Sequence, residues 1–89
     1  MFLEIITPDN KTFSGQATSV LVPGSEAKGS FEILDNHSAL VSSLQEGKVK
    51  IRTQEGKEVF YTISGGVIEV LNNHVIILAE SSQIDEFAK

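Results

Sequence analysis

The sequence predicts an all-β protein, a small flattened β-sandwich of about 8–10 short strands. Short apolar runs alternate with turn-forming residues about every 8–12 positions, a spacing typical of sandwiches and barrels. Within Lys48–Thr53, the apolar Val49 and Ile51 also alternate with three basic residues, as in a half-buried strand. Two dipeptides, Glu55-Gly56 and Asn72-Asn73, stand between such runs where hairpin turns are expected.

The first half of the chain contains five of these runs, and each is followed by residues that favour turns. The runs are Phe2–Thr7, Lys11–Ser14, Thr18–Val22, Ser30–Leu34 and Leu40–Leu44. The turn signals are Pro8-Asp9-Asn10, Gly15, Pro23-Gly24, Asp35-Asn36 and Glu46-Gly47. Leu40–Leu44 is too short for its periodicity to distinguish a strand from a helix.

The second half predicts two hairpins. Lys48–Thr53 pairs with Glu58–Ile63 through Glu55-Gly56, because glycine tolerates positive φ. Val67–Leu71 pairs with His74–Ala79 through Asn72-Asn73, since asparagine also adopts left-handed conformations. The Ser64-Gly65-Gly66 segment between the hairpins is expected to form a tight turn or bulge.

The chain is expected to form one domain over residues 1–80, followed by a short tail over residues 81–89. With 89 residues it has room for a single core. Ser82 could cap a helix with Asp85 three positions later, but so short a helix is marginal in water. We therefore expect the tail to be a frayed turn.

Composition excludes several classes of partner. The net charge is −5, whereas nucleic acids and anionic lipids require a basic surface. No apolar stretch approaches the ~20 residues of a membrane-spanning helix. The N-terminus lacks a basic region and carries Glu4 within its apolar run, so it is not expected to be a signal peptide. We expect no nucleic-acid partner and no direct membrane insertion.

Candidate catalytic and metal-binding residues are few. There is no cysteine. The two histidines, His37 and His74, each follow residues that favour a turn, and neither stands near a second potential metal ligand in a known metal-binding motif. The Gly24–Ser30 segment contains a lysine, but it precedes the second glycine and a strand follows, unlike a phosphate-binding loop. We therefore expect no active site, no metal and no cofactor.

Two strands carry apolar residues on both faces. Along Glu58–Ile63, the alternation places Val59, Tyr61 and Ile63 on one face and Phe60 on the other. His74–Ala79 is apolar on both sides, because Ile76 and Leu78 oppose its other aliphatic residues. A two-layer sandwich has only one interior, so the outward apolar residues need cover from a loop or from another protein.

Several motifs, taken in order, resemble the epsilon subunits of F-type ATP synthases. The resemblance covers about residues 2 to 80. The motifs are Leu3-Glu4-Ile5-Ile6-Thr7-Pro8, Phe13-Ser14-Gly15, Val20-Leu21-Val22-Pro23-Gly24-Ser25-Glu26, Gly29-Ser30-Phe31-Glu32-Ile33-Leu34, Ile63-Ser64-Gly65-Gly66-Val67-Ile68-Glu69-Val70 and Val75-Ile76-Ile77-Leu78-Ala79-Glu80.

The resemblance implies a non-catalytic subunit of the central stalk that forms a hetero-oligomer with the gamma subunit and the membrane c ring. It would couple gamma to the c ring during proton-driven ATP synthesis. The complex would place it peripherally on the cytoplasmic face of a bacterial inner membrane or on the equivalent organelle membrane. Carried over by position, Ser30, Phe31 and His37 would face the c ring, and Thr7 and Ser42 would face gamma. The alternation adds Phe60 to the gamma face.

Family members often continue into an inhibitory C-terminal helical hairpin. Because the sequence ends at Lys89, we expect this hairpin to be absent. One alternative function stays open: a free-standing β-sandwich module that binds a peptide or ligand along an edge strand.

Overall fold

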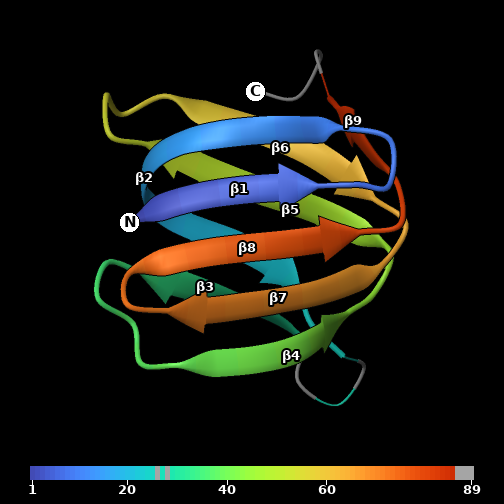
Figure 1. Ribbon diagram of the computed structural model, residues 1–89, viewed down its shortest axis with the longest axis horizontal. Coiled ribbons are helices and arrows are strands. Elements are labelled where there is room, and N and C mark those ends of the chain that lie inside the picture. The colour runs from blue at the N-terminus through green and yellow to red at the C-terminus, as the bar shows by residue number, and fades with distance from the viewer. Residues whose placement is uncertain (26, 28, 86–89) are drawn as a thin grey trace.

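The computed structural model describes residues 1–25, 27 and 29–85, and these form a two-layer β-sandwich (Figure 1). This confirms the predicted fold class. The strands are β1 (Phe2–Ile6), β2 (Lys11–Pro23), β3 (Ser30–Leu34), β4 (Leu40–Leu44), β5 (Gly47–Thr53), β6 (Glu58–Ile63), β7 (Gly66–Leu71), β8 (His74–Ala79) and β9 (Ser82–Ile84). Leu40–Leu44 is therefore a strand. The described residues form no helix that could cross a membrane.

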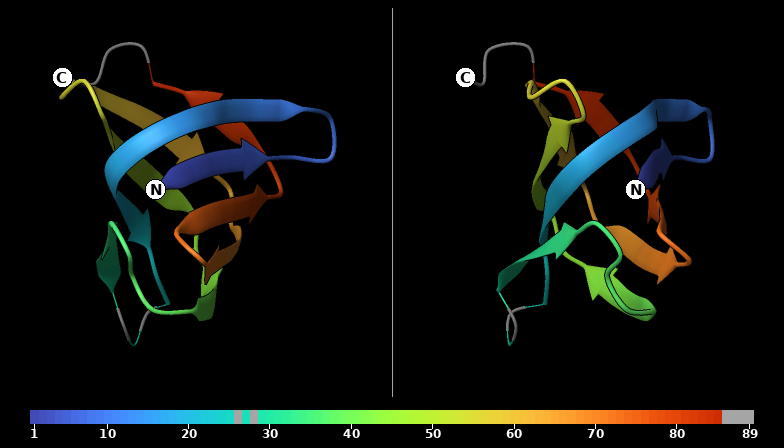
Figure 2. Two further views of the ribbon diagram at one scale, coloured as in Figure 1. Left: turned by 60° about the vertical axis from the view of Figure 1, so that its left-hand side comes forward. Right: turned by 90° about the vertical axis from the view of Figure 1, so that its left-hand side faces the viewer.

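The two layers share one long strand. The front layer has the order β4-β7-β8-β1-β2, and the back layer consists of β3, β2, β5, β6 and β9 (Figures 1 and 2). The first half of β2 pairs with β1 and its second half pairs with β3 and β5. The molecule measures 30 × 26 × 24 Å between Cα extremes, so any flattening is slight.

The prediction of two separate strands on either side of Gly15 was wrong. Lys11 to Pro23 is one strand of 13 residues, and its register shifts between Ala17 and Ser19, where the strand passes from one layer to the other. Gly15 remains extended, and a Cβ there would meet only Phe13, at 3.7 Å. The bend is thus made by a bulge rather than by the glycine.

The core lies between the layers and is built from alternate residues of the strands. Val49 and Ile51 are fully buried, as the alternation predicts, and Tyr61 and Val59 lie opposite them in β6. The core continues through Leu3, Ile5, Val20, Val22, Ile33, Ile68, Val75 and Ile77.

Both predicted hairpins are confirmed. Asn72 and Asn73 have φ values of 51° and 61°, and Gly56 has a φ of 90°. The β5–β6 pair runs from Gly47 opposite Ile63 to Arg52 opposite Glu58. β8 in turn lies parallel to β1, which connects the second hairpin to the start of the chain.

The prediction of a frayed tail was wrong for residues 82–84. Ser82–Ile84 form β9, antiparallel to Tyr61–Ile63 of β6. The free edge of β6 offers backbone groups that the tail satisfies, and Ser82 Oγ lies 3.2 Å from Thr12 Oγ1 of β2. The sandwich therefore extends to residue 84 instead of 80. The rest of the predicted tail, residues 86–89, lies outside the described residues.

Candidate partner-binding surface

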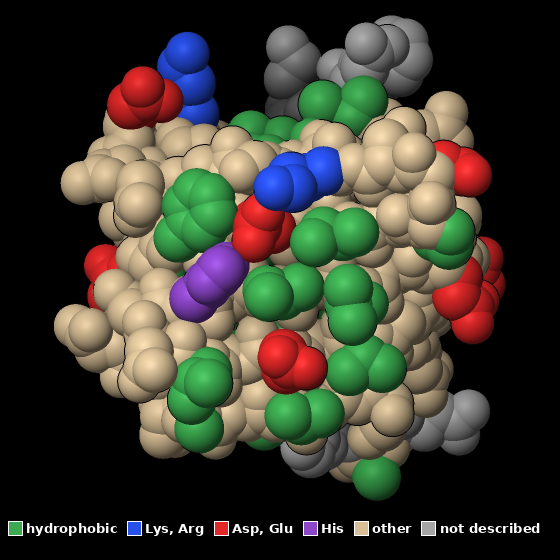
Figure 3. Space-filling model, in the orientation of Figure 1, with side chains coloured by type: hydrophobic (Ala, Val, Ile, Leu, Met, Phe, Trp, Pro, Cys, Tyr) green, Lys and Arg blue, Asp and Glu red, His purple; other side chains and the backbone are tan. Residues whose placement is uncertain are grey.

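The outer face of the front layer is unusually apolar. The strand register places seven apolar side chains on it, here called the front apolar face: Phe2, Ile6, Val41, Val67, Leu71, Ile76 and Leu78. Val41 is 68% exposed and Leu71 57%. Figure 3 shows hydrophobic side chains gathered over β1, β8 and β7. The sequence prediction that β8 carries outward apolar residues, Ile76 and Leu78, is confirmed.

A small ionic cluster lies within this face. Glu4 of β1 is almost buried, and its two carboxylate oxygens contact Lys11 Nζ at 2.5 Å and His74 Nε2 at 2.9 Å. The hydrogen bond from Lys11, followed by that from His74, lowers the pKa of the Glu4 carboxyl below its ordinary value. The His74 ring also meets Phe2 edge-on, with 5.2 Å between centroids. Glu4 is thus fully compensated without a partner protein.

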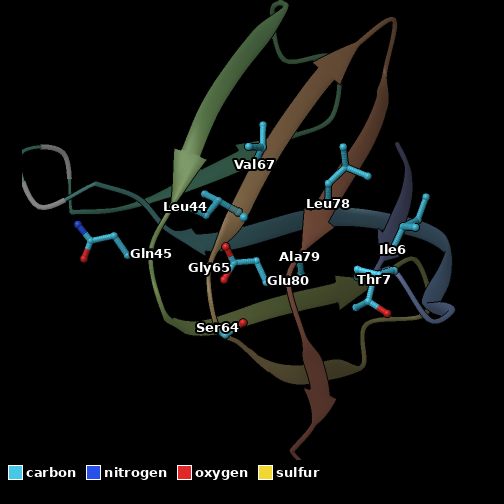
Figure 4. Close-up of a pocket in the computed structure, with 12 residues that line it drawn as sticks. Ile6, Thr7, Leu44, Gln45, Ser64, Gly65, Val67, Leu78, Ala79 and Glu80 are labelled. Carbon is cyan, nitrogen blue, oxygen red and sulfur yellow. The ribbon is translucent and has the colours of Figure 1, made fainter.

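A groove of about 700 Å³ continues the front apolar face at the end where β1 and β8 finish (Figure 4). Four neighbouring strands contribute aliphatic side chains to it: Ile6, Leu44, Val67 and Leu78. Gly66 lies in its wall with a φ of 157°, and a Cβ there would stand 2.1 Å from the carbonyl oxygen of Leu78. At Ser64-Gly65-Gly66, where a tight turn or bulge was expected, the chain bends at Ser64, Gly65 has a positive φ of 133°, and Gly66 already begins β7.

The outer face of the back layer is charged instead. Glu58 of β6 accepts from Arg52 at 2.9 Å and contacts Lys50 at 3.2 Å. These two contacts, that of Arg52 first, lower the pKa of the Glu58 carboxyl. Leu34 is 54% exposed on the same face, beside Ser19. The two outer faces of the sandwich therefore differ in chemical character.

The residues predicted to face gamma do not share one surface. Thr7 follows β1 and lines the groove. Ser42 lies in the edge strand β4 opposite buried Ile68, so its side chain is on the inner side of the front layer. Phe60 is half-buried on the outer face of the back layer, opposite Lys50. The alternation correctly placed Phe60 on an outer face, but it could not show whether that face belongs to the front layer or to the back layer.

Of the three residues predicted to face the c ring, two lie in β3 and the third lies beyond its end. Ser30 and Phe31 begin this strand, and His37 follows its other end. Phe31 packs over Gly24, where an added Cβ would come within 2.9 Å of its ring. His37 Nδ1 lies 2.7 Å from the carbonyl oxygen of its neighbour Ser38. Ser30 and Phe31 are therefore adjacent, whereas His37 belongs to a separate corner.

Sequence reasoning missed most of the front apolar face. Val67 and Leu71 alternate with buried residues in β7, and Val41 stands between two half-buried residues in β4, so each strand alone shows only that these side chains point outward. Only the pairing of β4, β7 and β8 shows that these residues adjoin. Among the described residues, no three His, Cys, Asp or Glu side chains are grouped so as to hold a metal ion.

Known proteins resemble this chain in sequence. Residues 1–84 match the family model of the ATP synthase delta/epsilon chain β-sandwich domain. The chain is 39% identical over 84 residues to the ATP synthase epsilon chain of Brevibacillus brevis, covering 94% of this chain and 62% of that protein. It is 40% identical over 78 residues to the epsilon chain of Chlorobium limicola, covering 88% of this chain and 86% of the relative.

Solved structures show the same fold. A chain of the Euglena gracilis mitochondrial ATP synthase, in a structure of its OSCP, F1 and c ring, superposes with a TM-score of 0.84 at 21% identity, covering 98% of this chain and 54% of that one. A chain of the Tetrahymena thermophila synthase central stalk and c ring has a TM-score of 0.78 at 22% identity, with coverages of 100% and 74%.

Proposed function

Because the chain belongs to the family of ATP synthase delta/epsilon chain β-sandwich domains, we propose that it is a non-catalytic subunit of the central stalk of a rotary ATP synthase. It couples the gamma subunit to the membrane c ring, so that rotation driven by proton flow is passed to the catalytic head. As part of that complex it lies peripherally, on the cytoplasmic side of the membrane or its organelle equivalent.

The observation that carries this proposal is the front apolar face. A monomer rarely exposes so continuous an apolar surface, and such patches mark contacts with other proteins. A standard interface covers about 800 Å² on each partner, roughly 15% of the 5265 Å² that this chain exposes. We assign this face, together with the groove that contains Thr7, to the gamma subunit.

The remaining predicted residues fit the proposal unequally. Ser42 points to the inner side of the edge strand β4, so we keep it in the gamma contact only at that free edge, beside the front apolar face. Ser30 and Phe31, at the start of β3, and His37, beyond its other end, stay assigned to the c ring. Phe60 lies on the opposite layer from the front apolar face, so we leave it out of the gamma contact.

Two exposed leucines provide a matched test of this assignment. Leu71 lies on the front apolar face and Leu34 on the back layer, with exposures of 57% and 54%. Leu71→Asp would bury a carboxylate against gamma, and we expect its affinity to fall at least ~30-fold, or about 2 kcal/mol. The Leu34→Asp variant should bind gamma with nearly the same affinity as the unmodified chain.

The measurement is titration of each purified variant with the gamma subunit of the same synthase, with thermal unfolding as a check of folding. Both leucines are exposed, so both variants should unfold close to the unmodified chain. Equal losses for the two variants, or a loss for Leu34→Asp alone, would contradict the assignment of gamma to the front face.

A further inference from the structure

One charged side chain on the front apolar face has no compensation. Glu69 lies in the middle of β7, exposed, with Ile76 opposite it in β8 and Val41 opposite it in β4. Its neighbours along the strand on the same face are Val67 and Leu71. Within the described part of the chain, no hydrogen bond or ion pair reaches its carboxylate.

Glu4, on the same face, is a carboxylate whose hydrogen-bonding partners lie within this chain. Both of its oxygens are occupied, one by Lys11 and the other by His74, and its side chain is almost buried. The strand register places Glu4 and Glu69 on either side of Ile76. The same sheet thus carries one carboxylate paired with two basic side chains and another that, among the described residues, no ion pair or hydrogen bond reaches.

A hollow adjoins the uncompensated carboxylate. It has a volume of about 300 Å³ and is lined by Glu69, Leu71, Asn72, His74 and Ile76. A long side chain could enter this hollow with its aliphatic part against Leu71 and Ile76 and its charged end at the Glu69 carboxylate. The shape of the hollow and the charge of Glu69 therefore both favour a long basic side chain.

We propose that the protein covering the front apolar face inserts a lysine or arginine side chain into this hollow and pairs it with Glu69. This rests on the proposed function, in which the covering protein is the gamma subunit. Covering Glu69 with apolar groups alone would bury an unpaired charge, which is strongly unfavourable. A cation of the partner at this point removes the cost of burying the Glu69 charge. It also favours a partner that carries the cation at that position, and so contributes to specificity and to the register of the contact.

The same argument disfavours a second copy of this chain as the occupant. A twofold contact centred at Glu69 would bring two copies of that carboxylate together, and the nearby cationic side chains, Lys11 and His74, already contact Glu4. The chain also carries a net charge of −5, which adds to the repulsion between copies. A basic partner is favoured instead.

The direction of one substitution tests the pairing. Glu69→Gln keeps the shape of the side chain and removes its charge. If a basic side chain of gamma pairs with Glu69, the affinity for gamma should fall at least about 10-fold, with a faster dissociation rate. Glu69→Lys should lose more. If no cation is present, removing an uncompensated charge should leave the affinity unchanged or increase it, which would overturn the inference.

Glu55→Gln is the matched control, because Glu55 is also an exposed glutamate but lies in the β5–β6 turn of the back layer. It changes the net charge equally and should leave gamma binding unchanged. An equal loss in both variants would mean that only overall charge matters, and would overturn the specific pairing.

The two proposals fail in distinguishable ways. If the unmodified chain does not bind gamma, the proposed function fails and the pairing falls with it. If the chain binds gamma but Glu69→Gln binds equally well, only the pairing fails. Sedimentation of the unmodified chain alone should give a monomer, and a dimer abolished by Leu71→Asp would instead identify a second copy as the occupant.

Discussion

Glu4 makes the stability of the protein depend on pH in a predictable direction. The contacts from Lys11 and His74 lower the pKa of its carboxyl below the ordinary 4.5 in the folded state. A group with a lowered folded pKa contributes stability above its unfolded pKa and loses that contribution as the pH falls through the folded value. The folded protein should therefore weaken below about pH 4.5, partly through this residue.

Urea unfolding at pH 7 and at pH 3 measures this contribution. Glu4→Gln should be less stable than the unmodified chain at pH 7, and the difference should shrink at pH 3. Glu58→Gln serves as an independent comparison, because the pKa of Glu58 is lowered by Arg52 and Lys50 on the opposite layer. A stability difference for Glu4→Gln that does not change with pH would contradict the ion-pair explanation.

For single residues, the backbone conformation at turns could be predicted from the sequence, but contacts between residues far apart in the chain could not. The positive φ of Asn73 and of Gly56 follows from the residue types themselves. The contact between Glu4 and His74, by contrast, joins residues separated by 70 positions. It exists because β1 and β8 are parallel neighbours, which no short stretch of sequence reveals.

Among the elements, the β7–β8 hairpin depends on two consecutive left-handed asparagines. Asn73 has a φ of 61°, and its Oδ1 also accepts the backbone N–H of Asn36 at 2.8 Å. Asn73→Gly and Asn73→Ala both remove this hydrogen bond, but only glycine adopts the left-handed conformation without strain. We expect the glycine variant to be about 1 kcal/mol more stable than the alanine variant.

Thermal unfolding resolves that difference, since about 1 kcal/mol corresponds to roughly 4–8 °C in a domain of this size. Comparing the two variants with each other cancels the lost hydrogen bond. Equal melting temperatures would mean that the turn relaxes to another conformation.

Strand boundaries were predicted well where a turn residue terminates the strand, as at both hairpins. They were missed in β2 and β9, where tertiary pairing decides. Gly15 favours a break, but pairing with β1 keeps it extended. Ser82 and Gln83 have little strand preference of their own, and the segment becomes β9 because the edge of β6 is available.

For the whole molecule, the fold class followed from periodicity, whereas the distinction between the two outer faces did not. Parity assigns each residue to the inside or the outside of its own strand, so it identified Phe60, Ile76 and Leu78 as outward. Which outward residues share a surface depends on the strand order β4-β7-β8-β1. The candidate partner surface could therefore be predicted to exist, but its position could not.

The size of the native particle separates the proposed function from a free-standing binding module. In a gently prepared extract containing detergent-solubilised membranes, the chain should elute with a complex far larger than its own 9.7 kDa. It should also fractionate with the synthase subunits. Elution near 9.7 kDa, with none in the larger fraction, would favour the free-standing alternative.

The sharing of β2 between the layers has a mechanical consequence. Its 13 residues cross from the front layer to the back layer without interruption. A load on either face is thus carried by covalent bonds and a ladder of peptide hydrogen bonds, and the layers cannot slip past each other as two separately connected sheets could. The domain should behave as a single stiff block with low shear compliance, and it should deform least along the direction of β2.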